Sequence, residues 1–167
     1  MLSTDSVVHE LYGSEELRDA VVARLGPGVA PDGTIDRTLI AGRVFANPDL
    51  REWLEGLLWP RVGARVAAWR EEVLAAQPLP RAAVVEVPLL YEAGMEAGFD
   101  AVIAVVADEA VRRDRAARRG HGAITERTAR QMTQEEKAQR ADYVVVNDGS
   151  PEILEHRLSE ILDKLTE

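Results

Sequence analysis

The chain has 167 residues, of which 46% are hydrophobic and 29% are charged, enough for one compact domain and too few for two large ones. No apolar run approaches the roughly 18 to 20 residues of a membrane helix, and no signal-peptide pattern opens the sequence, so we expect a soluble, cytoplasmic protein without membrane contact. The absence of cysteine excludes disulfides and thiolate chemistry, and the net charge of −9 argues against a nucleic-acid surface, which is normally basic.

The first half of the chain is expected to be mostly helical after a short strand end. Residues 2–4 have the character of a strand end, and Asp5 fits an N-cap for a helix that begins at Ser6. Ser14 and Asp36 occupy two further N-cap positions. The expected helices cover residues 6–12, 14–25, 36–45 and 49–76. Pro60 lies inside the last of these and is expected to force a kink or a restart.

The second half alternates between strand and helix patterns. Three β-branched, nearly continuous apolar runs are typical of strands that are buried on both faces of a parallel sheet; they cover residues 82–88, 100–107 and 141–147. Helices are expected over residues 108–119 and 124–138, and from Ser150 toward Lys164. The fold class is therefore α/β, with right-handed crossovers in a parallel sheet.

Ligand sites of open parallel sheets lie beyond the carboxyl ends of the strands. In this sequence those ends hold Asp5, the segment EVPLLYE at 86–92, Asp108, and Asn147 with Gly149. The stretch that follows Asp108 is crowded with arginine; its members are Arg112, Arg113, Arg115, Arg118, Arg119, Arg127 and Arg130. These arginines fit a solvated helix face, but their position directly after a strand end favours a lid that clamps a polyphosphate.

Several linked motifs together resemble the dephospho-coenzyme A kinase family, whose members carry out the last step of coenzyme A biosynthesis. They are STD followed by VVHEL, DGTIDR with VFANP, LEGLLWP, VPLLYE, the pair Arg115 and Arg118, the pair Arg127 and Gln131, EEKAQRAD, and VVNDG. They occur in the family's order and spacing along essentially the whole chain. The resemblance implies a P-loop-kinase-like parallel sheet flanked by helices.

The resemblance also implies roles for individual residues on the phosphate side of the reaction. Asp5 matches the family's catalytic base, which accepts the proton of the ribose 3'-hydroxyl of dephospho-coenzyme A. Arg115 and Arg118 match arginines that neutralise charge during phosphoryl transfer from ATP, and Arg127 assists them. Residues 147–149 resemble the loop near the ATP adenine, with Asn147 and Gly149 as binding residues.

On the acceptor side, the resemblance implies a substrate wall and a helical coenzyme A subdomain. Leu89, Leu90 and Glu92 match the wall. His9 stands where other members carry Arg, and Arg37 belongs to the signature that ends at Phe45. The implied organisation is one kinase domain over 1–167, with a coenzyme A subdomain at 14–76, a sheet core at 82–107 and 141–167, and a lid region at 108–138. No residue of the chain is assigned as a ligand of the Mg²⁺ that accompanies ATP.

One family element is missing from the sequence. Family members begin with a strand, a G-x-x-x-x-G-K-[ST] phosphate loop and a helix, and neither lysine of this chain, Lys137 or Lys164, lies in such a loop. We therefore expect a chain that has lost its ATP site and the central strand of its sheet, and that is inactive as written. Three interpretations stay open: a kinase whose start lies upstream, a non-catalytic paralogue that binds coenzyme A-like ligands or a partner protein, and a nucleoside-kinase-type phosphotransferase.

Overall fold

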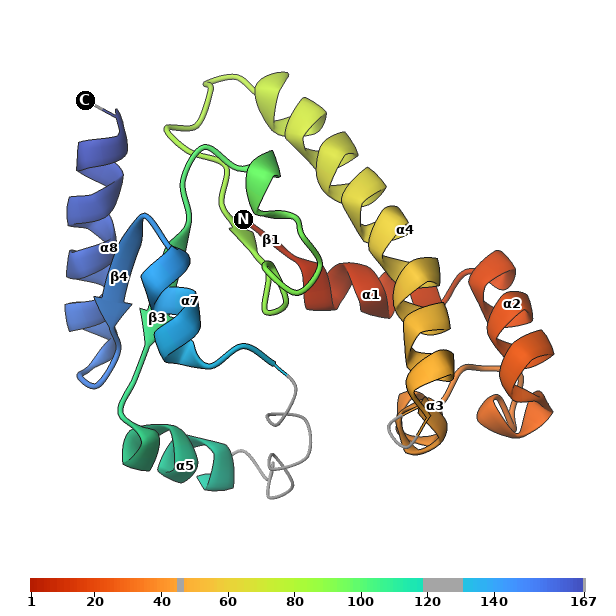
Figure 1. Cartoon of the computed structure of the whole chain (residues 1–167). Coiled ribbons are helices and arrows are strands. Elements are labelled where there is room, and N and C mark those ends of the chain that lie inside the picture. Colours follow the sequence, from red (N-terminus) through yellow and green to blue (C-terminus); the bar gives the residue numbers. More distant parts are fainter. Residues whose placement is uncertain (45–46, 119–130, 167) are drawn as a thin grey trace. The chain divides into compact units, whose positions relative to one another are not determined.

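The computed structural model describes residues 1–44, 47–118 and 131–166, which fall into two compact units, Met1–Pro88 and Leu89–Glu167. The elements of the first unit are β1 (Leu2–Ser3), α1 (Thr4–Tyr12), α2 (Glu15–Leu25), the 3-10 helix η1 (Pro27–Val29), α3 (Arg37–Val44), α4 (Pro48–Leu74) and β2 (Val85–Glu86). Strands β1 and β2 pair in parallel, with Leu2 opposite Val85 and Ser3 opposite Glu86. Helices α1 and α3 both pack against α4 (Figure 1).

Polar side chains fix the starts of three of these helices. The side-chain oxygens of Ser14, Asp36 and Asn47 each accept backbone N–H hydrogen bonds from the first turn of α2, α3 and α4, respectively. The helix starts expected at Ser14 and Asp36 are confirmed. Apolar side chains of the same helices and of η1 form the main core; its fully buried members include Leu17, Val21 and Val29.

Helix α1 begins earlier than the sequence indicates, and the expected N-cap role of Asp5 is wrong. The helix starts at Thr4, so Ser3 holds the N-cap position, without a side-chain cap bond, and Asp5 lies in the first turn. The buried Thr4 hydroxyl donates a hydrogen bond to the Glu86 carbonyl oxygen at 3.1 Å, which ties the chain to β2 at the point where it turns into the helix. The positive end of the helix dipole still stabilises the Asp5 carboxylate.

Helix α4 is continuous from Pro48 to Leu74, so, of the kink or restart expected at Pro60, the restart is wrong (Figure 1). Proline removes one i→i−4 hydrogen bond. A single buried face nevertheless runs through both sides of Pro60 at four-residue spacing; it consists of Leu54, Leu58, Val62 and Val66. Burial of this face outweighs the lost bond, and the Arg61 guanidinium donates to the Leu57 carbonyl oxygen at 2.8 Å beside it.

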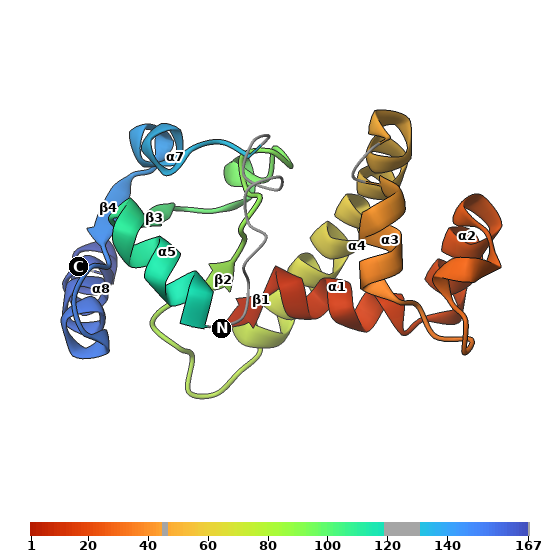
Figure 2. The ribbon, with the colours of Figure 1, turned by 90° about the horizontal axis from the view of Figure 1, so that it is seen from below.

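The second unit is built on another parallel pair of strands. Its elements are the 3-10 helix η2 (Glu96–Gly98), β3 (Ile103–Val106), α5 (Glu109–Arg118), α7 (Gln134–Arg140), β4 (Tyr143–Val146) and α8 (Pro151–Thr166). The register runs from Ile103 opposite Tyr143 to Val106 opposite Val146. Helix α7 lies beside β3 and α8 beside β4, as Figure 2 shows from below. The expected helix from Ser150 is confirmed. Of the helix expected at 124–138, residues 124–130 lie outside the described residues, and α7 begins at Gln134.

The expectation that the strands are buried on both faces is wrong. Val105, Val144 and Val146 are 51%, 47% and 43% exposed, whereas Ala104 and Val145 are buried. Within the described ranges the strands form two separate pairs, β1 with β2 and β3 with β4, so each strand has one neighbour and a partial helical cover. The parallel α/β class itself is confirmed.

Candidate functional site

In the first unit, two carboxylates follow the carboxyl ends of adjacent parallel strands. Asp5 lies two residues beyond β1, and Glu86 is the last residue of β2, paired in register with Ser3. Both residues are exposed, while Thr4 between them is buried and bonded to the Glu86 carbonyl oxygen. The backbone under Asp5 is thus fixed and its carboxylate is open to a ligand, which suits a proton acceptor.

Two further residues assigned from the sequence lie in this unit. His9 is exposed one turn after Asp5 on α1, and Arg37 is the exposed first residue of α3. Burial raises the pKa of the Tyr12 phenol, and the positive charge of Arg37 opposes that rise. Arg37 therefore lies near Tyr12, the last residue of α1, which is the helix that carries Asp5 and His9.

In the second unit, three residues that the sequence assigns to nucleotide binding come together beyond the carboxyl ends of β3 and β4. The Arg115 guanidinium donates to the Asn147 carbonyl oxygen at 2.7 Å and to the Gly149 carbonyl oxygen at 3.1 Å. A planar guanidinium fork suits such a double contact. Arg115 thereby joins α5 to the loop after β4.

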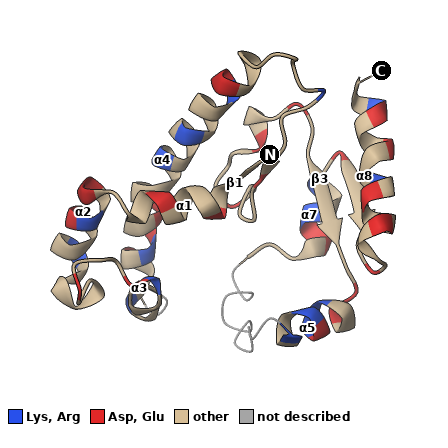
Figure 3. Ribbon diagram, turned by 180° about the vertical axis from the view of Figure 1, so that it is seen from behind, with Lys and Arg blue, Asp and Glu red and all other residues tan. Residues whose placement is uncertain are grey.

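The other arginines of α5 form surface ion pairs with acidic residues of the same helix. Figure 3 shows that basic and acidic positions both occur along α5. Arg118 has a side chain that is 78% exposed and pairs with Asp114 at 3.0 Å, and Arg112 pairs with Glu109 at 3.0 Å. Exposed pairs of this kind are weak, so an anionic ligand can displace the carboxylate from Arg118. Arg127, the third arginine assigned to the nucleotide, lies outside the described residues, as does Phe45.

Two aspartates, Asp108 and Asp148, connect the ends of β3 and β4; the sequence places Asp108 beyond a strand end and assigns no role to Asp148. Asp148 Oδ1 accepts a hydrogen bond from the Asp108 N–H at 2.7 Å, and Asp108 Oδ1 accepts one from the Ala110 N–H at 2.7 Å. The first bond joins the loops after β3 and β4, and the second caps α5. An aspartate directly after each apolar run was a usable signal for such a connection.

The wall residues Leu89, Leu90 and Glu92 lie in a turn at the start of the second unit, all of them partly buried. Glu92 Oε1 accepts from the Met132 N–H at 2.9 Å and forms an ion pair with Lys137 Nζ at 3.0 Å. Glu92 therefore holds the start of α7. Sequence reasoning did not find this contact, because its partners lie 40 and 45 positions further along the chain.

A comparison with protein-family models decides the relationship. The dephospho-CoA kinase model matches residues 2–152. The chain belongs to the dephospho-CoA kinase family. The family assignment from sequence motifs is thus confirmed, and with it the kinase class of the chain's relatives.

Individual relatives agree with the family model. A dephospho-CoA kinase of Anaeromyxobacter dehalogenans is 44% identical over 81% of this chain, which covers 64% of that protein, less than two thirds of its length. One of Chlamydia abortus is 37% identical over 96% of this chain and 81% of its own length. A crystal structure of TT1252 from Thermus thermophilus matches 99% of this chain and 84% of its own, at a TM-score of 0.74 and 33% identity. A Campylobacter jejuni dephospho-CoA kinase, 20% identical, shares the fold at a TM-score of 0.61.

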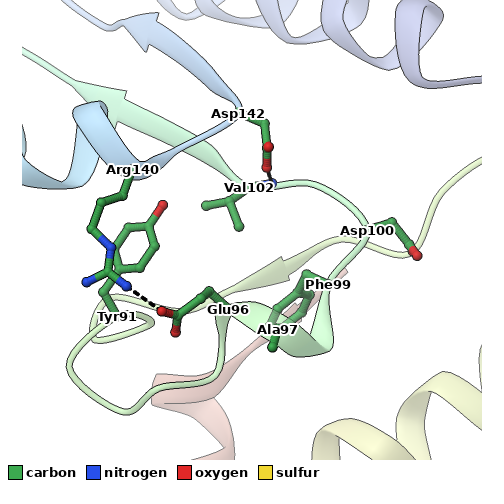
Figure 4. A pocket seen from close by; sticks show the side chains of 8 residues that line it. All are labelled: Tyr91, Glu96, Ala97, Phe99, Asp100, Val102, Arg140 and Asp142. Atoms are coloured by element: carbon green, nitrogen blue, oxygen red, sulfur yellow. Dashed lines mark hydrogen bonds and ion pairs between the residues drawn. The ribbon is translucent and has the colours of Figure 1, made fainter.

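A pocket of about 360 Å³ lies at the amino-terminal end of the β3–β4 pair, opposite the end that is followed by Asp108 and the 147–149 loop. Figure 4 shows that its lining includes Tyr91, Glu96, Phe99, Val102, Arg140 and Asp142. The Arg140 guanidinium lies 4.3 Å from the Tyr91 ring centre and pairs with Glu96, while Asp142 accepts from the Val102 N–H at 2.8 Å. Burial, Asp142 and Glu96 raise the pKa of the Tyr91 phenol, and Arg140 opposes them. Among the described residues, those assigned to the kinase site do not line this pocket.

Two kinds of feature are absent from the part of the chain that the structure describes. Within the described ranges, none of the helices combines the length and the apolar character needed to cross a lipid bilayer. In the same ranges, no three acidic or histidine side chains gather into a group that would hold a metal ion.

Proposed function

We propose that the protein to which these residues belong is a dephospho-CoA kinase, which transfers the γ-phosphoryl group of ATP to the ribose 3'-hydroxyl of dephospho-coenzyme A. The proposal is supported by the family match over residues 2–152. Because the chain covers 64% of one relative and 81% of another, the activity is proposed for the whole protein rather than for these residues alone.

The placement of Asp5 is the observation that carries the proposal. An exposed carboxylate at the end of a parallel strand, on a first helical turn fixed by Thr4, is available to a hydroxyl group. In the proposed step, Asp5 accepts the proton of the 3'-hydroxyl while the ribose oxygen forms a bond to the γ-phosphorus. The bond between the γ-phosphorus and the oxygen that bridges it to the β-phosphorus breaks, and ADP leaves.

On the donor side, Arg118 and Arg127 contact the phosphate oxygens during transfer, and Asn147 and Gly149 contribute the loop beside the adenine. Arg115 shares this side of the site, and two of its donors hold the loop carbonyls. On the acceptor side, Leu89 and Leu90 form the pocket wall with Glu92 behind them. His9 and Arg37 bind the dephospho-coenzyme A, together with the helical region 14–76.

The phosphates of ATP and the Mg²⁺ bound to them are not assigned to residues of this sequence. The 167 residues contain no G-x-x-x-x-G-K-[ST] loop, and the described ranges hold no metal-binding group of acidic or histidine side chains. We therefore propose that residues outside these 167 bind the phosphates and that the 167 residues alone do not turn over. Bound Mg²⁺ would neutralise charge on the transferred phosphoryl group.

The test compares the 167-residue chain with an extended chain, in which a strand, a G-x-x-x-x-G-K-[ST] loop and a helix precede the same residues. Both chains are incubated with ATP and either dephospho-coenzyme A or a set of nucleosides. We expect the extended chain to phosphorylate dephospho-coenzyme A and leave the nucleosides unchanged. Nucleoside phosphorylation without dephospho-coenzyme A turnover would reject the assignment in favour of a nucleoside-kinase-type enzyme. Dephospho-coenzyme A binding without turnover by either chain would indicate a non-catalytic paralogue.

A further inference from the structure

The side chain of Gln134, in the first turn of α7, makes two hydrogen bonds to a single residue, Ala107. Its Oε1 accepts from the Ala107 N–H at 3.0 Å, and its Nε2 donates to the Ala107 carbonyl oxygen at 2.8 Å. A side-chain amide presents a donor and an acceptor together and so matches the two polar groups of a backbone residue. The pair of bonds joins α7 to the carboxyl end of β3.

Ala107 is the first residue after β3, where the chain leaves the strand toward α5 and the residues assigned to nucleotide binding. The next residue, Asp108, bonds to Asp148 and caps α5. Helix α5 carries Arg115, which returns to the Asn147 carbonyl oxygen. These hydrogen bonds connect the end of β3, helix α5 and the loop after β4 to one another. The Gln134 amide binds the backbone of Ala107, the residue from which this set of contacts begins.

The remainder of α7 is held in place by contacts of Lys137 and Arg140, so the helix that carries the Gln134 amide has a fixed position. Lys137 forms an ion pair with Glu92 at 3.0 Å, and both side chains are largely buried, at 22% and 17% exposed. Arg140 pairs with Glu96 and lies over the Tyr91 ring at 4.3 Å. Because these contacts fix the rest of α7, they also fix the position of Gln134 at its start.

We propose that Gln134 is a positioning residue for the nucleotide side of the site. By holding the backbone of Ala107, it sets the point from which α5 departs and therefore the place of Arg115 and of the 147–149 loop. The ligand of that side, ATP, rests on the proposed function; the positioning rests on the hydrogen bonds themselves.

The experiment uses the 167-residue chain and two substitutions of the amide. Gln134→Met keeps the side-chain length and removes both bonds, and Gln134→Glu keeps the acceptor and loses the donor. Gln139→Met and Gln139→Glu are matched controls, because Gln139 is exposed on the same helix and the described ranges record no side-chain hydrogen bond for it. The measurements on the 167-residue chain are hydrogen exchange at the Ala107 amide and the NMR resonances of the Arg115 Nε–H and the Gly149 N–H. The calorimetric affinities for ATP and dephospho-coenzyme A are measured on the extended chain with the same substitutions.

For Gln134→Met we expect faster exchange at Ala107, displaced Arg115 and Gly149 resonances, and an ATP affinity about tenfold weaker with dephospho-coenzyme A affinity unchanged. The Gln139 variants should behave as the original chain. Unmoved Arg115 and Gly149 resonances, or equal weakening for both ligands, would overturn the proposal. If the unsubstituted extended chain binds neither ligand, the proposed function fails, while the resonances of the 167-residue chain still decide the positioning. If Gln134→Met does not fold, Gln134→Glu is judged by the same measurements.

Discussion

The Arg115 guanidinium donates a hydrogen bond to the Asn147 carbonyl oxygen at 2.7 Å and so joins helix α5 to the loop that follows β4. Both residues were assigned to nucleotide binding from sequence motifs, and the structure brings them into contact. The contact gives Arg115 a positioning role in addition to its charge. Arg118 differs from Arg115 in this respect, because its exposed guanidinium forms an ion pair with Asp114 of the same helix.

We predict that Arg115→Gln lowers the free energy of unfolding by about 1–2 kcal/mol, because two charged hydrogen bonds to the loop are lost. Arg118→Gln should change it by less than about 0.5 kcal/mol, since its ion pair with Asp114 is exposed. Urea denaturation of both variants checks the difference. Equal losses of stability would contradict the positioning role of Arg115.

The helical core of the first unit makes a second prediction. Leu17 is fully buried within the cluster formed by α2, η1, α3 and α4, so Leu17→Ala should cost about 2–5 kcal/mol. Leu39 on α3 is 42% exposed, and Leu39→Ala serves as the matched control with an expected cost below about 1 kcal/mol. Chemical denaturation followed by circular dichroism measures both values. A similar cost at the two positions would argue against this core.

The Tyr12 phenol predicts a dependence of stability on alkaline pH. Burial raises its pKa in the folded chain above the ordinary value of 10.0, despite the opposing charge of Arg37. The folded state then retains the phenolic proton to higher pH than the unfolded state, so the stabilisation is complete below about pH 10 and is lost as the pH rises through the folded-state pKa. The free energy of unfolding of the original chain should therefore fall relative to that of Tyr12→Phe over the alkaline range that begins near the ordinary pKa of 10.0. A constant difference across this range would exclude the effect.

Pro60 predicts a stabilising substitution. Since α4 is continuous through Pro60, alanine at that position restores the missing backbone hydrogen bond and improves helix propensity. We expect Pro60→Ala to raise the free energy of unfolding by about 1–3 kcal/mol. Ala64→Ser on the exposed part of the same helix is the control, with an expected change below about 0.5 kcal/mol. A lower stability for Pro60→Ala would show that the proline ring is required for packing.

Local signals in the sequence predicted much of the fold. The side chains of Ser14 and Asp36 cap helices where expected, because a cap depends on residues within one turn of it. The Asp5 cap was wrong because the start of α1 depends on a bond from Thr4 to Glu86, 82 positions away. The strand runs were correctly placed, but their burial depends on how many neighbours each strand has.

Some residues of the candidate site could also be predicted from local signals, whereas others depend on contacts between residues far apart in the sequence. Asp5, Arg115, Asn147 and Gly149 follow strand ends, a rule that a single sequence can reveal. The anchors of α7 are contacts of Glu92 and Gln134 with distant backbone groups, and neither the spacing nor the type of these residues indicates them. Their identification required the fold.

The most direct test of the central claim is the rate at which the extended chain phosphorylates dephospho-coenzyme A when Asp5 is replaced. Asp5→Asn removes the proton acceptor and keeps the size of the side chain, and Glu10→Gln neutralises another exposed carboxylate of α1 as the control. We predict that Asp5→Asn lowers kcat by about 10²–10⁴-fold with little change in dephospho-coenzyme A affinity, and that Glu10→Gln retains full turnover. Turnover by Asp5→Asn within a fewfold of the unsubstituted extended chain would contradict the assignment of Asp5 as the base.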